Sequence, residues 1–336
     1  MYSFSLRPVR PIFSQNIPSQ DCPTCGDSVK LVSTQPLAEP LAQPVALVNP
    51  LVQENDQLKQ QLQQLTVSLE KSQTELKLYK EIAEYGNHPH SRPAGIYKVK
   101  INRLPANKLK IQTFDKAPSL PAKIDLRSKF PPVIDQGDLG SCTACAISGL
   151  VGYDIPGFIG SPLFMYYNEC VLEGHVGDDS GATVPDTIAT LAKYGICPES
   201  DWPYNINNFA VKPPTKAYTN GTKHKAIKYA NILNTLNGMK QSLVSGCPFI
   251  LGITVYSSFE TMAVERTGMV PMPSKRDSIL GGHAVVCVGY DDSKQRFIMR
   301  NSWGPLWGDK GYFYLPYAYL LNIDLASDLW CVSKMT

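Results

Sequence analysis

Cys142 is the residue whose setting in this sequence best suits nucleophilic chemistry. It follows a glycine-rich stretch, 136–141, and lies near the start of a segment of helix-forming composition, 141–155. A thiol at a helix N-terminus lies close to unpaired backbone N–H groups and to the positive end of the helix dipole, and both favour the thiolate. Because the thiolate is the reactive form near pH 7, this position predicts a cysteine nucleophile.

A nucleophilic cysteine needs a base, and His283 is the candidate. It follows two glycines and begins a run of small and apolar residues that is typical of a buried strand. The other histidines lie in polar or loop contexts: His88, His90, His175 and His224. A single histidine in such a strand is more often a core residue than a base. The catalytic interpretation of His283 therefore needs support from a third residue.

Asn301 is that third group, because it ends the next predicted strand and is followed two residues later by Trp303. An asparagine oxygen can accept a hydrogen bond from one imidazole N–H and so fix the tautomer and orientation of the ring. A neighbouring indole can keep water away from that hydrogen bond. A nucleophile, its base and a residue that orients the base together predict acyl-transfer chemistry at Cys142.

The elements that must position these residues are helices followed by strands. Helical patterns occupy 141–155, 163–172 and 184–195, and strand patterns occupy 248–256, 284–290, 296–301 and 311–315. This order predicts an α+β domain with two unlike halves. The composition of a compact domain begins near residue 120 and continues to residue 336.

The composition of the chain narrows the class of protein. Among 336 residues 43% are apolar, the net charge is +3, and no basic run is dense enough to predict a nucleic-acid surface. The sequence lacks a run of about 18 apolar residues that would predict a transmembrane helix, and its N-terminus lacks the apolar run of a secretory signal. We therefore expect an intracellular protein, or one packaged in a virion if its source is a virus, without membrane or nucleic-acid partners. The nine cysteines are then expected to be mostly reduced core residues.

Residues 1–50 are rich in proline and polar residues and are predicted to be disordered. They contain Cys22 and Cys25, which form half of a four-cysteine zinc pattern. The other Cys-x-x-Cys pair is Cys142 and Cys145, in which Cys145 is expected to be a small buried residue one turn after the nucleophile. We therefore predict neither a metal nor a cofactor, with a zinc site shared between chains as the alternative.

Residues 51–85 predict a long helix with a heptad repeat. Its a and d positions hold Leu51, Leu58, Leu62, Leu65, Leu69, Leu76, Tyr79 and Ala83. Asn55 and Ser72 are the polar positions of this seam. Two interpretations stay open: self-association as a coiled coil, or a single amphipathic helix packed on its own catalytic domain. Residues 86–119 follow as an extended linker or a propeptide.

The three motifs together resemble the papain family of cysteine peptidases. The order is Cys, His, Asn, and His283 lies about 140 residues after Cys142, inside the interval of about 130–150 residues typical of that family. The pattern Gln-Gly-x-x-Gly-Ser-Cys ends at Cys142, and Asn-Ser-Trp-Gly-x-x-Trp-Gly-x-x-Gly-Tyr begins at Asn301. Residues 120–127, Leu-Pro-Ala-Lys-Ile-Asp-Leu-Arg, resemble the start of a mature papain-like domain, so the likeness covers about 120–336.

The resemblance implies a two-lobed fold, with a helical left lobe and a β-barrel-like right lobe, and an endopeptidase that acts on polypeptides. Cys142 would attack the peptide carbonyl and form a thioester, and His283 would protonate the leaving amine and then activate water. Asn301 would orient His283, and Trp303 would shield that contact. The Gln136 side chain and the Cys142 backbone N–H would form the oxyanion hole.

The resemblance also implies a substrate strip. The segment Asp179-Ser-Gly-Ala182 aligns with the glycine-rich strip that lines the substrate cleft in relatives. Ser180 and Gly181, together with Trp303, are therefore the expected substrate-binding residues.

The sequence departs from the family pattern at several places. Thr143 follows the nucleophile where relatives usually have Trp, and Leu139 stands where relatives often have a disulfide-bonded Cys. The inhibitory-helix motif of many papain proregions is not legible in 51–85. These departures favour microbial and viral members of the family over the lysosomal ones, and they fit a reducing compartment.

Two other functions compete with an active endopeptidase. One is an inactive papain-fold scaffold that acts through its coiled coil, and the other is acyl transfer to an amine instead of water. For residues 1–119 we expect an autoinhibitory or targeting role, as in a zymogen. In that interpretation the helix 51–85 rests on the domain and the extended residues 96–118 approach or cross the cleft.

Overall fold

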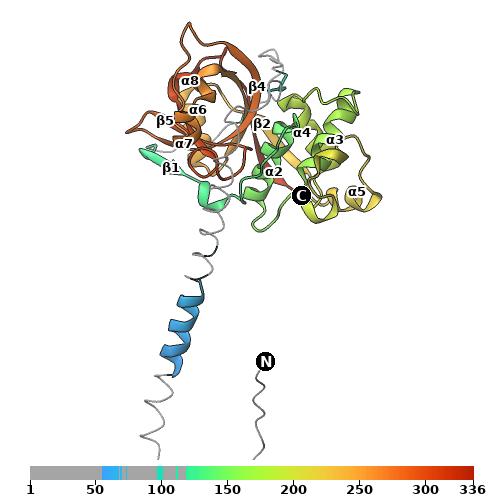
Figure 1. The fold of residues 1–336 in the computed structure, drawn as a ribbon, viewed down its shortest axis with the longest axis vertical. Coiled ribbons are helices and arrows are strands. Elements are labelled where there is room, and N and C mark those ends of the chain that lie inside the picture. The colour runs from blue at the N-terminus through green and yellow to red at the C-terminus, as the bar shows by residue number, and fades with distance from the viewer. Residues whose placement is uncertain (1–54, 68, 70–72, 74–96, 101–110, 113–118) are drawn as a thin grey trace, which may run out of the picture. The chain divides into compact units, whose positions relative to one another are not determined.

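The computed structural model describes residues 55–67, 69, 73, 97–100, 111–112 and 119–336. The chain divides into two compact units, Met1–Ser68 and Leu69–Thr336. In the second unit the longer helices gather on one side, and most of the strands lie with short helices on the other (Figure 1). This unit is an α+β fold with two unlike lobes, as the sequence predicts.

The helical lobe is built around a few well-capped helices. Its members are α2 (Cys142–Asp154), α3 (Pro162–Glu173), α4 (Val184–Tyr194) and α5 (Thr215–Gly221). Ser161 caps α3 by accepting from the Phe164 N–H, and Thr183 caps α4 by accepting from the Asp186 N–H. Short 3-10 turns connect the elements of the second unit: η2 (Arg127–Lys129), η3 (Glu199–Asp201), η4 (Ile206–Asn208) and η5 (Ser257–Glu260).

The strand lobe is an antiparallel sheet with strand order β2-β7-β3-β4-β5-β6, and β1 pairs with β4. The strands are β1 (Lys123–Asp125), β2 (Ala226–Asn231), β3 (Phe249–Tyr256), β4 (Ile279–Asp291), β5 (Arg296–Arg300), β6 (Tyr312–Pro316) and β7 (Ala326–Met335). Three short helices accompany the sheet: α6 (Leu236–Val244), α7 (Met262–Thr267) and α8 (Tyr317–Leu321). The long strand β4 lies at the centre of these pairings.

The two faces of β4 belong to two different cores. Val285 and Cys287 pack into the apolar cluster of the strand lobe, whereas Val286 and Val288 pack into the cluster shared with the helices. This alternation follows from the two-residue period of a strand, which sends successive side chains to opposite faces. Strand β4 therefore joins the two lobes, and a residue on it can meet groups from both.

Residues 55–67 of the first unit are helical, in agreement with the heptad pattern. The seam residues Leu58, Leu62 and Leu65 are exposed, with 58%, 66% and 67% of their surface accessible. The rest of the predicted helix lies outside the described residues, apart from residues 69 and 73. The predicted disordered region 1–50 and the cysteines Cys22 and Cys25 also lie outside them.

The predicted helices and strands of the domain are confirmed as α2, α3, α4, β3, β4, β5 and β6. One expectation needs correction: His283 does not begin its strand but lies inside β4, which starts at Ile279. The strand extends further because Gly281 and Gly282 continue the ladder with β3. Strands β2 and β7, which pair with each other although they lie about 100 residues apart in the chain, were not predicted from the sequence.

Candidate active site

Cys142 is the first residue of α2 and is completely buried. Ser141 occupies the N-cap position but makes no side-chain capping bond, because its hydroxyl group hydrogen-bonds the Tyr204 hydroxyl group at 2.5 Å. The backbone N–H groups of the first helical turn have no partner four residues earlier in the helix. The predicted position of Cys142 at a helix N-terminus is therefore correct.

Burial raises the pKa of the Cys142 thiol to about 12. A hydrogen bond with the Ala284 backbone lowers this pKa, and the nearby carboxyl group of Glu169 raises it. The contact with Ala284 places the sulfur beside β4, next to the residue that follows His283. In the state described here, the thiol is neutral at pH 7.

His283 and Asn301 meet because of the register between two strands. Val286 of β4 pairs with Arg300 at the end of β5, so the chain that leaves β5 at Asn301 continues alongside His283. His283 Nε2 lies 2.8 Å from Asn301 Oδ1, and both side chains are buried. Because this oxygen accepts from a ring N–H, Nε2 carries a proton and Nδ1 is the nitrogen that can exchange one.

Trp303 covers the contact between His283 and Asn301. Its indole stacks on the imidazole with ring centroids 4.8 Å apart and 28° between the planes. Phe259 and Trp307 hold the indole by edge contacts at 5.7 and 4.8 Å. With 2% of its surface exposed, Trp303 shields the histidine as the resemblance implies.

Gln136 is buried just ahead of α2 and is held at both ends of its amide. Its Nε2 donates to the Leu139 carbonyl oxygen at 2.9 Å, and its Oε1 accepts from the Ser302 hydroxyl group at 2.6 Å. Its backbone N–H also donates to the Ser302 carbonyl oxygen at 2.9 Å. Gln136, the first residue of the motif that ends at Cys142, is therefore tied to Ser302, the residue after Asn301.

The segment Tyr97–Lys100, which we call the strap, lies across this site. Lys98 forms a parallel β-bridge with Gly282, and the Val99 N–H donates to the Gly282 carbonyl oxygen at 3.1 Å. On the opposite side, the Lys100 N–H lies 3.4 Å from the Ala182 carbonyl oxygen. The strap therefore bonds through its backbone to both lobes.

Glycines allow this close approach. A Cβ atom on Gly282 would lie 2.2 Å from the Val99 carbonyl oxygen, and one on Gly181 would lie 2.2 Å from the Lys98 carbonyl oxygen. Gly181 also has a φ of +71°, which glycine adopts without strain. Gly181 thus lies beside an extended chain. Ser180 is in the same loop, where its N–H donates to the Asp178 carbonyl oxygen, and it has no described contact with the strap.

The strap bonds to Gly282, the residue before His283, and its Tyr97 ring also lies against the His283 ring. The Tyr97 ring meets the imidazole edge-on, with centroids 6.0 Å apart, and lies 5.9 Å from the indole of Trp303. Val99 is 7% exposed and belongs to the same apolar cluster as Cys142. The strap thus contacts His283 and packs in the apolar cluster that contains Cys142.

Thr143, a departure from the family pattern, has a partner that the sequence analysis missed. Its hydroxyl group donates to Glu169 Oε2 at 2.8 Å, which links α2 to α3. Glu169 is completely buried, and burial raises its pKa to about 8 although the hydrogen bond from Thr143 lowers it. The sequence feature that could have revealed this contact is a glutamate in the middle of the predicted helix 163–172, where most residues are apolar or aromatic.

The seven cysteines among the described residues all have free thiols, and six of them are buried. Cys145 is one of these, 3% exposed, with its sulfur 3.8 Å from the Ser141 hydroxyl group. The burial of these six cysteines agrees with the expectation of core residues in this part of the chain.

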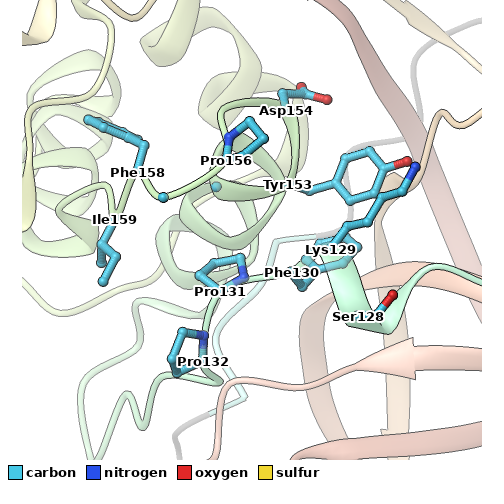
Figure 2. Close-up of a pocket in the computed structure, with 12 residues that line it drawn as sticks. Ser128, Lys129, Phe130, Pro131, Pro132, Tyr153, Asp154, Pro156, Phe158 and Ile159 are labelled. Carbon is cyan, nitrogen blue, oxygen red and sulfur yellow. The ribbon is translucent and has the colours of Figure 1, made fainter. Parts of the chain in front are cut away.

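A separate pocket of about 700 Å³ lies at the far end of α2 from Cys142. Figure 2 shows Pro131 and Pro132 on one side of it and Phe158 and Ile159 on another. Lys129 extends along the ring of Tyr153 at its edge, with Nζ 5.8 Å from the ring centroid. The predicted site residues are absent from its lining, so this pocket is distinct from the site at Cys142.

Two other features are absent from the part of the chain that the structure describes. Within the described ranges, no group of three or more His, Cys, Asp or Glu residues is arranged to hold a metal ion. The helices in those ranges are also too short or too polar to span a membrane.

Comparisons with known proteins agree on one family. A profile described as "Papain family cysteine protease" matches residues 120–328. An uncharacterised peptidase C1-like protein of Acanthamoeba polyphaga mimivirus is 42% identical over 217 residues, covering 60% of this chain and 70% of that protein. A cathepsin B-like protein of Giardia intestinalis is 32% identical over 213 residues, covering 59% and 69%.

A solved structure gives the same result. Xylellain, a cysteine protease from Xylella fastidiosa, is 37% identical with a TM-score of 0.65, and the match covers 72% of this chain and 97% of that one. Procathepsin B from Trypanosoma congolense is similar in fold, with 17% identity and a TM-score of 0.57.

Proposed function

The chain belongs to the papain family of cysteine proteases, and we propose that it is an endopeptidase in which Cys142, His283 and Asn301 form the catalytic triad. The observation that carries the proposal is the bond of 2.8 Å between His283 Nε2 and Asn301 Oδ1, shielded by Trp303. This bond commits one ring nitrogen and leaves Nδ1 for proton transfer. The contact of the Cys142 sulfur with the neighbouring Ala284 backbone supports the pairing of nucleophile and base.

The chemical steps follow from these positions. Once a substrate is bound, the Cys142 thiol gives its proton to His283 Nδ1, and the resulting thiolate attacks the peptide carbonyl carbon, so that the carbonyl oxygen becomes an oxyanion. We propose that the Cys142 N–H and the second Nε2 proton of Gln136, whose first donates to the Leu139 carbonyl oxygen, stabilise it. His283 gives its Nδ1 proton to the leaving amine, which breaks the C–N bond and leaves a thioester. His283 then takes a proton from water, the hydroxide displaces the thiolate, and the acid product leaves.

Active-site labelling tests this assignment. An epoxide thiol inhibitor should modify Cys142 stoichiometrically, and Cys142→Ala should abolish peptide hydrolysis. Cys145→Ala is the matched control, because Cys145 is also buried in α2 one turn later. Full hydrolysis by Cys142→Ala would exclude this nucleophile. Failure to label Cys142 in a protein whose strap (Tyr97–Lys100) has been released would favour the inactive scaffold.

We further propose that the strap is autoinhibitory. Its backbone bonds both lobes and its Tyr97 ring lies against His283, so a substrate cannot occupy the same space. Burial also keeps the Cys142 thiol neutral. After the strap, the Gln112 N–H donates to the Asn231 carbonyl oxygen at 2.7 Å, which supports a second attachment of the same region.

A full-length variant with reversed charges tests autoinhibition. Lys98 and Lys100 form ion pairs with Asp179 and Glu173, so Lys98→Glu/Lys100→Glu places like charges against both carboxylates. We call this protein the open variant. It should hydrolyse peptides and react with iodoacetamide at Cys142 about tenfold faster or more than the parent chain. Lys123→Glu breaks the Lys123–Asp291 ion pair elsewhere and serves as the control. Equal rates in parent, control and open variant would reject autoinhibition.

We propose that residues 51–85 mediate self-association. The motive is the heptad seam with Asn55 in it, and the exposed Leu58, Leu62 and Leu65 of the described helix support it. Sedimentation of the full chain should show a dimer or larger species that Leu58→Asp/Leu62→Asp converts to monomer. A monomeric parent chain would leave the amphipathic-helix interpretation.

We also propose that the protein works in a reducing compartment, because the described cysteines are free. Thiol alkylation of the chain isolated without reductant should modify all seven of them after unfolding. Disulfide-linked peptides among these cysteines would contradict the proposal.

A further inference from the structure

The side chains of the strap show which way the side chains of an extended polypeptide point when it lies in this cleft. Alternate side chains of such a chain face opposite walls. Tyr97 and Val99 face the strand lobe, where they contact His283 and lie near Gly252. Lys98 and Lys100 face the helical lobe, where each meets a carboxylate.

Asp179 is the carboxylate that receives Lys98. The distance from Lys98 Nζ to Asp179 Oδ2 is 2.5 Å, and the two side chains are 28% and 22% exposed. Asp179 Oδ1 accepts from the Gly140 N–H at 3.0 Å and from the Tyr166 hydroxyl group at 2.5 Å. Oδ1 therefore makes the shorter bonds that fix the carboxylate, whereas Oδ2, which also lies 3.3 Å from the Gly140 N, receives the ammonium group.

The Lys98 side chain lies close to the nucleophile motif. Gly140 stands two residues before Cys142, and a Cβ atom on it would lie 2.8 Å from Lys98 Cδ and 2.9 Å from Asp179 Oδ1. The absence of a side chain at Gly140 leaves the space in which a long side chain crosses to Asp179. The position therefore belongs to the part of the cleft beside the scissile bond.

Glu173 forms a second contact of the same kind two residues further along the strap. Lys100 Nζ lies 2.6 Å from Glu173 Oε2, which also lies 3.0 Å from His175 Nε2. The other oxygen accepts from the Thr183 N–H at 3.0 Å. The spacing of the two carboxylates thus matches positions i and i+2 of an extended chain.

We propose that Asp179 is a specificity-determining residue that selects substrates with Lys or Arg at the position now held by Lys98, with Glu173 favouring a second basic residue two positions away. The inference rests on the proposed peptidase function. Backbone contacts with Gly282 and Ala182 accept any sequence, so discrimination has to come from side-chain contacts. A neutral substrate side chain would cover Asp179 and leave a partly desolvated carboxylate without a cation. The direction of the bound chain does not alter which wall receives alternate side chains.

Matched peptides test the selection in the open variant, which retains the full chain. Fluorogenic peptides should carry lysine, norleucine or glutamate at successive positions around the scissile bond. At one position we expect kcat/KM for lysine to exceed that for norleucine about tenfold or more, as a charge-assisted hydrogen bond gives. Glutamate should be the poorest residue there.

Asp179→Asn in the open variant should reduce the lysine-to-norleucine ratio severalfold towards one. The asparagine oxygen can still accept from Gly140 and Tyr166, so the loop keeps its bonds. Asp178→Asn, at the exposed neighbouring residue, is the control and should keep the ratio. The lysine preference of the open variant is measured with Asp179 unchanged. The selection can therefore still be tested if the Asp179 variant folds poorly.

The two proposals fail in different ways. Hydrolysis that needs Cys142 but has a lysine-to-norleucine ratio near one at every position would overturn the selection by Asp179. A clear ratio that survives Asp179→Asn in a folded protein would overturn it as well. Absence of any Cys142-dependent hydrolysis would instead overturn the proposed function.

Discussion

The two walls of the cleft offer different things to an extended polypeptide. The wall from β4 presents backbone groups at Gly282 and, on the next residue, the imidazole of His283. The wall from the helical lobe presents the carboxylates of Asp179 and Glu173. Under the proposals made above, one wall would serve the chemistry and sequence-independent alignment, and the other would select side chains. Separate walls would then allow selectivity to change without disturbing the proposed triad.

The largest effect should come from the β4 wall. His283→Ala in the open variant should lower kcat/KM for peptides by at least about 10³-fold, because the thiolate loses its base and the leaving amine its proton donor. His224→Ala is the control, since His224 packs on Phe158 outside the cleft. Comparable losses in the two variants would show that the histidine acts through folding and not through chemistry.

A smaller effect should follow from blocking the backbone contact at Gly282 on that wall. A Cβ atom at Gly282 would lie 2.2 Å from the Val99 carbonyl oxygen, so Gly282→Ala should raise KM of the open variant about 10-fold or more. At Gly252 in the adjacent strand β3 the nearest atom is 3.7 Å away, and Gly252→Ala should change KM much less. Similar KM values for the two variants would argue that substrates do not follow the path of the strap.

The helical-lobe wall should make strap binding sensitive to acid. Burial favours the neutral form of Glu173, but the hydrogen bonds from Lys100 and His175 outweigh it and lower its pKa below 4.5. The contribution of this ion pair to strap binding is therefore complete above pH 4.5 and is lost as pH falls through the lowered pKa. Hydrogen exchange in the parent chain should show severalfold weaker protection of the Val99 and Lys100 amides at the acid end.

Glu173→Gln should weaken protection of these amides at neutral pH and remove its dependence on acid. An unchanged acid dependence in Glu173→Gln would assign the effect to another group.

The smallest effect on turnover should come from Glu169, behind the nucleophile. Its pKa is raised to about 8, so its stabilising proton is in place below 4.5 and the free energy of unfolding falls as pH rises towards 8. Within this window the loss is about 1.4 kcal/mol per pH unit for one such group. Glu169→Gln can still accept from Thr143, and it should flatten the unfolding free energy measured by denaturant between pH 5 and 8. Parallel pH profiles for the two proteins would contradict a buried neutral Glu169.

Local patterns predicted much of the fold. The helices around Cys142 and after Ser161 and Thr183 begin where cap residues and prolines stand in the sequence, and β3, β4 and β5 are marked by apolar runs. Strand β7 was missed because its residues 326–335 mix polar and apolar types. It becomes a strand by insertion between β2 and β3, which lie far from it in the chain.

The sequence by itself was enough to predict Cys142, His283 and Asn301 as the candidate triad, because a helix start, a strand and a strand end are each local features. Only the tertiary structure determined how deeply Cys142 is buried and how its thiol is protonated. Val99, more than 40 positions away, belongs to the same apolar cluster as Cys142, and burial raises the pKa of the thiol. The same holds for the pairing of Lys98 with Asp179, residues that are separated by 81 positions. Burial and charge pairing depend on which distant segments share a surface, and local residue patterns do not contain that information.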